Sequence, residues 1–201
     1  MRSQPTPRTG PFTVITLSGS LRASSSNTAV LSALAALAGP PLEVSAYLGL
    51  GELPHFNPDL DTDEARPAAV RAWRAAIAAT DALVLCSPEY AHGVPGSLKN
   101  ALDWLVSGPE FPALIVALIN TSPRSTHAQA ALAETIRTMS ADLLSPSIWT
   151  VPLAGRRPTV PDILQDQSLA GPLRELLAAL EGAIRNARAA DRRLIGARTS
   201  P

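Results

Sequence analysis

The sequence predicts a three-layer α/β fold, in which a parallel β-sheet lies between two layers of helices. Short apolar runs rich in β-branched residues alternate along the chain with longer segments whose apolar residues recur at helical spacing. Such alternation is typical of βαβ units, and parallel sheets built from them are covered on both faces. Two of the apolar runs lead directly into polar turns, and open α/β sheets bind their ligands at such strand ends.

The first half of the chain supplies two strands and two helices. The run at 12–17 is β-branched and of strand length, and aliphatic residues at helical spacing follow it over 27–38. A second short strand is expected at 42–46. The segment 67–80 reads as a helix, because Pro67 suits the first turn and three large apolar residues share one face: Val70, Trp73 and Ile77.

The second half repeats the alternation. A buried strand is expected at 82–86, and a helix at 97–106 begins behind a Pro-Gly pair. The remaining elements are a strand at 113–120, a helix at 127–140, a short strand at 147–151 and a final helix at 169–192, for which Gly182 marks a potential interruption. We therefore expect one domain over 12–193, a disordered tail at 1–11 and a flexible tail at 194–201.

The turn after the first strand has the composition of a phosphate site. It reads SGSLRASSSN from Ser18 to Asn27, with many hydroxyls, one guanidinium at Arg22 and no carboxylate. Hydroxyls, backbone N–H groups and a helix N-terminus favour phosphate, and arginine binds two phosphate oxygens at once. Helix capping would explain one of these hydroxyls. The turn lacks GxxxxGK[ST] and GxGxxG, so a terminal monophosphate such as that of FMN fits better than a triphosphate or a dinucleotide.

Two motifs together resemble the NADPH-dependent FMN reductase family of flavodoxin-like proteins. The chain reads GSLRASSSN where that family has GSLRxxSxN, and PEYAHGVPGSLKNALDWL where it has PEYNxxxPGxLKNAxDWL. The segment LPHFNPDLD at 53–61 is also similar, and the match extends over 12–149. The resemblance implies a five-stranded parallel sheet of order 2-1-3-4-5, FMN as cofactor and NADPH as co-substrate.

The resemblance also implies which residues form the site. The expected phosphate-binding residues are Ser18, Ser20, Arg22, Ser25, Ser26 and Asn27. Those expected along the flavin are Pro88, Glu89, Tyr90, Ala91, His92, Gly93 and Ser122. Tyr90 and Arg124 are the expected substrate contacts, with Arg124 at the 2′-phosphate of NADPH. No metal ligand is expected, and no catalytic side chain, because the hydride chemistry takes place at flavin N5.

Several of these residues also have ordinary structural explanations. Ala91 replaces the family's Asn, so a side-chain contact to the flavin is absent there, although a backbone N–H could serve. Glu89 is expected in a structural or interface role. His92 fits a site residue and a solvent-facing residue equally, and a structural role is favoured for His127. Cys86 ends a buried strand and is expected to be a small core residue rather than a redox thiol.

Composition limits the classes of function. Among 201 residues, 17 basic side chains balance 17 acidic ones, which argues against a nucleic-acid partner. One cysteine permits no internal disulfide, in keeping with a reducing cytoplasm. No apolar stretch could span a bilayer, and the N-terminus lacks the apolar core of a signal peptide. We therefore expect a cytoplasmic homodimer or homotetramer with a small-molecule electron acceptor: a flavin, quinone, azo or nitro compound, or chromate.

Two other functions remain open from the sequence. A flavodoxin-type electron carrier would bind FMN without reacting with NADPH, but such carriers are typically acidic and this chain is neutral. A binding module that had lost the flavin would have no reason to keep Arg22 beside so many hydroxyls. A ping-pong reaction in a single pocket is the expectation for the enzyme.

Overall fold

The computed structural model describes residues 9–153 and 155–198. The described strands are β1 (Phe12–Ser18), β2 (Leu42–Ala46), β3 (Ala82–Cys86), β4 (Ile115–Asn120) and β5 (Asp142–Thr150). The described helices are α1 (Ser26–Leu37), α2 (Ala68–Ala79), α3 (Gly96–Asp103), α4 (His127–Thr138), α5 (Val160–Gln165) and α6 (Gln167–Arg198). Short 3₁₀ helices at Gly49–Glu52 and Pro58–Leu60 lie between β2 and α2.

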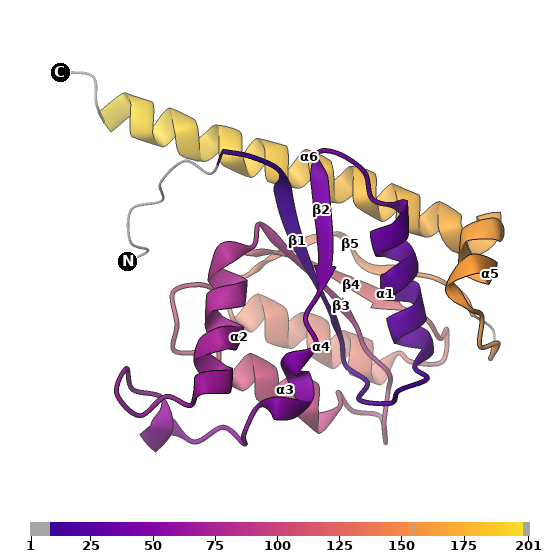
Figure 1. The fold of residues 1–201 in the computed structure, drawn as a ribbon, viewed down its shortest axis with the longest axis horizontal. Coiled ribbons are helices and arrows are strands. Elements are labelled where there is room, and N and C mark those ends of the chain that lie inside the picture. The colour runs from indigo at the N-terminus through magenta and orange to yellow at the C-terminus, as the bar shows by residue number, and fades with distance from the viewer. Residues whose placement is uncertain (1–8, 154, 199–201) are drawn as a thin grey trace.

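All neighbouring strands of the sheet pair in parallel, in the order β2-β1-β3-β4-β5. This confirms the expected fold class and strand order. Helices α1, α5 and α6 pack on one face of the sheet, and α2, α3 and α4 pack on the other (Figure 1). Strands β3 and β4 are buried along their whole lengths, as central strands covered on both faces must be.

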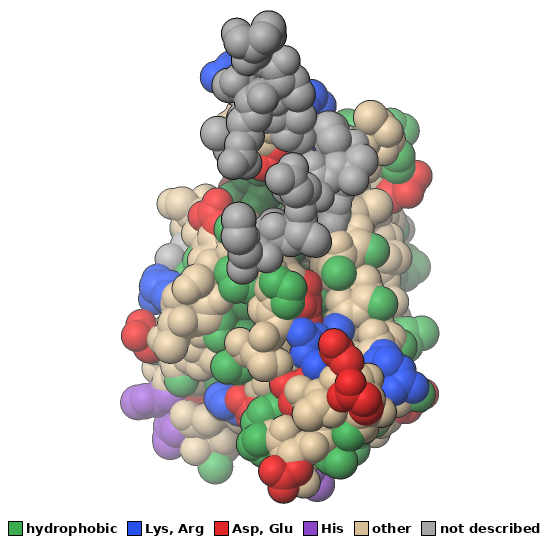
Figure 2. All heavy atoms as spheres, turned by 90° about the vertical axis from the view of Figure 1, so that its left-hand side faces the viewer, with side chains coloured by type: hydrophobic (Ala, Val, Ile, Leu, Met, Phe, Trp, Pro, Cys, Tyr) green, Lys and Arg blue, Asp and Glu red, His purple; other side chains and the backbone are tan. Residues whose placement is uncertain are grey.

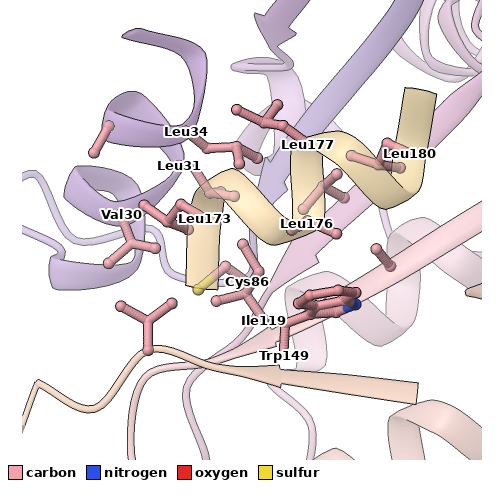
Figure 3. Close-up of a cluster of buried hydrophobic side chains, with 14 of the residues drawn as sticks. Val30, Leu31, Leu34, Cys86, Ile119, Trp149, Leu173, Leu176, Leu177 and Leu180 are labelled. Carbon is pink, nitrogen blue, oxygen red and sulfur yellow. The ribbon is translucent and has the colours of Figure 1, made fainter. Parts of the chain in front are cut away.

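The core beneath α1 and α6 consists mainly of aliphatic side chains. Figure 3 shows leucines of α6 lying against those of α1, with Trp149 of β5 and Cys86 of β3 below them. Cys86 is fully buried, and burial raises the pKa of its thiol well above the ordinary range. The prediction that Cys86 is a core residue is confirmed.

Strand β5 begins five residues earlier than expected. It starts at Asp142, and its pairing with β4 shifts register between Val116 and Leu118. Pro146 lies inside it. The sequence did not predict residues 142–146 as strand, because proline disfavours a strand interior. However, β5 is an edge strand, where proline and bulges are tolerated.

Residues with a positive φ shorten two expected elements. Ala113 has φ 60° and Ser140 has φ 62°, which is the left-handed region that side chains other than glycine seldom adopt. Strand β4 therefore begins at Ile115 rather than at Ala113, and α4 ends before Ser140.

The C-terminal third differs most from expectation. Helix α5 was not predicted, and α6 passes through Gly182 without a break. Buried leucines on one face of α6 outweigh the weak helix propensity of glycine. Residues 194–198 continue α6, whereas residues 1–8 and 199–201 of the two expected tails lie outside the described residues.

A buried ion pair ties α6 to the start of the sheet. Arg188 on α6 contacts both carboxylate oxygens of Asp81, at 3.1 and 2.6 Å. The guanidinium also donates to the backbone carbonyls of Gly10 and Pro11, at 2.9 and 2.8 Å, and lies over the ring of Phe12. The two charged side chains are only 10% and 6% exposed, so this contact is part of the core rather than of the surface.

Candidate functional site

Three loops meet at the carboxyl edge of the sheet, after β1, β3 and β4. Gly19 at the start of the first loop packs on the second, since a Cβ there would lie 2.9 Å from the Ser87 hydroxyl. The Thr121 hydroxyl of the third loop donates to the Asn27 side chain of the first, at 2.8 Å. The Gln129 amide of α4 donates to the Ser87 carbonyl, at 3.2 Å. These contacts fix the three loops relative to one another.

The first loop, between β1 and α1, presents hydroxyls around the start of α1. Ser25 is the N-cap of α1, and its hydroxyl accepts from the Thr28 N–H. The Ser18 hydroxyl accepts from the Thr28 hydroxyl at 3.2 Å and from the Ser20 N–H at 3.2 Å. The first turn of α1 holds no acidic residue, so nothing in it opposes an anion.

The donor set of this loop fits the phosphate of FMN. The Arg22 side chain is exposed and has no side-chain partner among the described residues. A shallow cavity of about 330 Å³ lies beside the loop, with Ser24, Ser26 and Ser32 in its lining. Arg157 and Pro158, from the segment before α5, also line it. Hydroxyls and a helix N-terminus are suitable donors for a phosphate dianion, and Arg22 on the loop and Arg157 in the cavity lining each offer a guanidinium nearby.

The second loop, between β3 and α3, makes a tight turn. Tyr90 and Gly93 exchange two backbone hydrogen bonds, of 3.1 and 2.9 Å. The two residues between them, Ala91 and His92, have φ of 50° and 59°. Consecutive positive φ values describe a type I′ turn, which favours Asn and Gly. The backbone therefore gives a physical reason for the Asn that the family usually has where this chain has Ala91.

Replacing Ala91 with glycine is expected to raise the free energy of unfolding by about 0.5–1 kcal/mol, because glycine adopts a positive φ without steric cost. Urea denaturation measures the change. The matched control is Ala130→Gly on the exposed face of α4, which is expected to lower stability by about 1 kcal/mol. A loss of stability in both variants would contradict the assignment of strain to this turn.

Glu89 connects the second loop to α4. One carboxylate oxygen accepts from the Ala128 N–H at 2.8 Å, and the other lies 3.0 Å from Nδ1 of His92. The hydrogen bond from Ala128 is the main cause that holds the pKa of Glu89 below its ordinary value; partial burial opposes it and His92 adds to it. The Glu89 side chain therefore caps a helix, in keeping with the expected structural role.

The two histidines of the second and third loops lie together. The ring of His127, the first residue of α4, meets the ring of His92 edge to face, with centroids 4.5 Å apart. Histidine side chains appear in the lower part of the surface in Figure 2, toward the end of the molecule to which the strands point. No motif of the chain predicted this contact.

The third loop, between β4 and α4, is held from within. The Asn120 side chain accepts from the Ser122 N–H at 3.0 Å and donates to the Ser125 carbonyl at 3.3 Å. Arg124 is exposed, and its side chain has no partner among the described residues. Ser122 and Arg124 are thus on the loop where they were expected, and their contacts with ligands stay predictions.

Two polar side chains of the motif LKNALDWL bind the backbone of the loop after β2. The Asn100 amide of α3 accepts from the Phe56 N–H at 2.7 Å and donates to the Pro54 carbonyl at 2.9 Å. The Trp104 indole N–H donates to the same carbonyl at 2.8 Å. The motif LKNALDWL therefore fixes the loop after β2 as well as α3.

The expected site residues fall on the three loops, but the sequence missed Arg157. Its place opposite Ser24 and Ser26 depends on α5, which was not predicted. The stretch TVPD at 159–162 could have revealed that helix, because Thr159 and Asp162 form a capping box around Pro161. Among the described residues no group of three or more His, Cys, Asp or Glu is arranged to hold a metal ion.

The profile of the NADPH-dependent FMN reductase family matches residues 12–152. The chain belongs to this family. The resemblance drawn from the two motifs is confirmed, and so is FMN as the family's cofactor.

Relatives of known name agree with the family. The chain is 40% identical to a quinone reductase of Escherichia coli (strain K12) over 99 residues, which are 49% of this chain and 53% of that protein. It is 42% identical to a 2-hydroxy-1,4-benzoquinone reductase of a Burkholderia species over 86 residues, 43% of this chain and 45% of that protein. The matches thus span about half the length of these curated relatives.

A solved structure extends the likeness to the whole fold. FerB of Paracoccus denitrificans, a flavoenzyme NAD(P)H:(acceptor) oxidoreductase, superposes with a TM-score of 0.71 at 28% identity. The superposition covers 87% of this chain and 98% of FerB. Within the described part of this chain, no helix has both the length and the apolar character needed to cross a lipid bilayer.

Proposed function

We propose that this protein uses bound FMN to pass electrons from NAD(P)H to a small quinone-type acceptor. One observation carries the proposal: a hydroxyl-rich loop, whose Arg22 side chain has no partner among the described residues, packs at Gly19 against Ser87, the start of the β3–α3 loop that carries the strained turn. The first loop offers donors for a phosphate, and the second offers exposed backbone for a flat ring. Bound FMN supplies the redox chemistry, accepting a hydride and delivering two electrons.

The side chains and backbone of the three loops would bind FMN and orient its ring. Arg22 and the hydroxyls around the N-terminus of α1 hold the phosphate, and the segment from Pro88 to Gly93 lies along the ring. Its backbone N–H groups stabilise negative charge on the reduced ring. NAD(P)H and the electron acceptor would use the same exposed side of the flavin in turn, which gives a ping-pong reaction.

Two arginines are candidates for contacts with ligand phosphates, Arg124 for the 2′-phosphate of NADPH and Arg157 for the phosphate of FMN. Arg124 lies on the β4–α4 loop, and it remains our candidate because that loop leads into the start of α4, which contacts the β3–α3 loop through the Ala128–Glu89 hydrogen bond. Arg157 lines the cavity beside the phosphate loop. Its position beside the phosphate loop favours a contact with the phosphate of FMN. Each arginine would therefore serve a different ligand.

Quinones are favoured as acceptors by the names of the relatives, while azo, nitro and chromate acceptors remain within the proposal. The electron-carrier alternative is disfavoured by the neutral charge of the chain. We also propose a homodimer or homotetramer in the cytoplasm. The apolar stretch at 104–106 gives little support to an interface, because Trp104 and Leu105 are buried within the chain and only Val106 is exposed.

The test is an anaerobic visible spectrum of the protein loaded with FMN, before and after NADPH is added. We expect the flavin to stay bound through desalting and to bleach rapidly with NADPH. Bound flavin that does not bleach would indicate an electron carrier. Absence of bound flavin, together with no stimulation of NADPH oxidation by free FMN, would overturn the proposal.

A further inference from the structure

Glu89, His92 and His127 form a connected cluster beside the expected ring-binding turn. Glu89 lies between α4 and the turn, and its side chain is 9% exposed, whereas that of His92 is 76% exposed. In the described part of the chain, the charged or titratable groups that face the His92 ring are the Glu89 carboxylate of its own loop and the His127 imidazole of α4.

The geometry determines which nitrogen of His92 is free. An ionised carboxylate only accepts hydrogen bonds, so Nδ1 of His92 donates to Glu89 across the 3.0 Å contact. The other nitrogen, Nε2, then points away from the carboxylate and has no partner among the described residues. A carboxylate on one ring nitrogen fixes the orientation of the ring and so of the other nitrogen, as in catalytic triads.

The backbone of the turn that carries His92 is strained. Ala91 and His92 are adjacent non-glycine residues with positive φ, and each such residue costs on the order of 1 kcal/mol. A turn kept only for tightness would favour glycine at these positions. The strained turn instead places an imidazole between a buried carboxylate and solvent, at the loop expected along the flavin.

We propose that the His92 imidazolium is the proton donor to the quinone-type acceptor, with Glu89 and His127 as positioning residues. The proposal rests on the proposed function. Reduction of a quinone to a hydroquinone consumes two electrons and two protons. The electrons and one proton come from NADPH by way of FMN. The second proton leaves Nε2 of His92 for the acceptor oxygen, and the neutral imidazole regains a proton from water through its exposed edge.

The first experiment separates proton delivery from electron transfer. FMN-loaded protein is reduced with dithionite, freed of excess reductant, and mixed anaerobically with benzoquinone or with ferricyanide, which takes up one electron and no proton. In His92→Gln we expect oxidation by benzoquinone to slow about 100-fold, at the low end of general-acid effects, and to lose its decline with rising pH. Oxidation by ferricyanide is expected to change less than about two-fold.

Matched variants control for folding and packing. His55→Gln changes the remaining histidine of the chain, outside the cluster, and is expected to leave both rates unchanged. His127→Phe keeps a ring against His92 and is expected to retain most of the benzoquinone rate, whereas His127→Ala is expected to reduce it. Equal slowing with both oxidants in His92→Gln, or no slowing with either, would overturn the proposal.

The second experiment needs neither cofactor nor substrate. NMR of the ¹⁵N-labelled apoprotein reports which ring nitrogen of each imidazole carries a hydrogen-bonded proton, with His92 assigned from its loss in His92→Gln. The Nδ1 proton of His92 is expected to be held by Glu89, so Glu89→Ala is expected to release it and to leave the signals of His55 unchanged. A His92 ring whose signals are unaltered in Glu89→Ala would show that the carboxylate does not orient it, and would overturn the proposal. A failure of NADPH to reduce the flavin would count against the proposed function but not against either experiment.

Discussion

Replacing Arg188 with alanine is expected to lower the free energy of unfolding by about 3 kcal/mol, the typical cost of removing one partner of a buried ion pair. Asp81, whose side chain is 6% exposed in the wild type, would keep its negative charge and its hydrogen bonds from Thr13 but lose the guanidinium. The backbone carbonyls of Gly10 and Pro11 would lose their donor as well. Urea denaturation of the wild type and the variant at pH 7 measures the difference.

The same helix supplies a matched control. Arg185 pairs with Glu181 one turn away, and its side chain is 60% exposed, so Arg185→Ala is expected to cost only about 0.3–0.5 kcal/mol. Equal losses in the two variants would show that the buried pair with Asp81 contributes no more than an exposed ion pair does.

The pH dependence of stability gives an independent check on Arg188. Burial alone would raise the pKa of Asp81, but the hydrogen bonds from Arg188 and Thr13 and the charge of Arg188 lower it below its ordinary value. A lowered folded-state pKa stabilises the fold above the ordinary value of about 3.9, and this contribution is lost as the pH falls through the folded-state pKa. The gap between wild type and Arg188→Ala is therefore expected to narrow below about pH 4.

Replacing Arg22 with alanine is expected to weaken FMN binding by about 2 kcal/mol, or about 30-fold, the range for a hydrogen bond to a charged group. The Arg22 side chain has no partner among the described residues, so its removal breaks no ion pair of the folded chain. Stability without cofactor is expected to change by less than about 0.5 kcal/mol. Fluorescence titration of the apoprotein with FMN measures the affinity.

Riboflavin, which lacks the phosphate, is the control ligand for Arg22. Its affinity is expected to be the same in the wild type and in Arg22→Ala. The control variant is Arg156→Ala, since Arg156 pairs with Asp166 at 3.3 Å and lies outside the lining of the cavity. A parallel loss of riboflavin affinity would show that Arg22 supports the loop rather than the phosphate.

Local patterns predicted most of the fold. Strands β2 and β3 begin and end where their apolar runs do, and α1 and α2 differ from expectation by one residue at each end. The errors fall where tertiary contacts override local preference. An edge position tolerates Pro146 within β5, and buried leucines carry α6 through Gly182.

The composition of the loops predicted which segments form the candidate site, but not the contacts between residues of different segments. The hydroxyl-rich loop with Arg22 and the polar turn after β3 are legible in the sequence, because each is continuous along the chain. The contact of His92 with His127 joins residues from different loops, and Arg157 reaches the cavity from a segment much farther along the chain. Such pairs depend on the strand order and on how the loops pack, which single-chain patterns do not encode.

The tie between Arg188 and Gly10 joins residues 178 positions apart. A ribosome makes the chain from its N-terminus, so all five strands and the three loops are synthesised before the residue that fastens the first strand. Until then Asp81 lacks its ion pair with Arg188, and the base of the sheet lacks the contacts that this arginine makes. Completion of the domain is therefore a late event in synthesis, and a nascent chain that stops short of Arg188 leaves the sheet unfastened at its base.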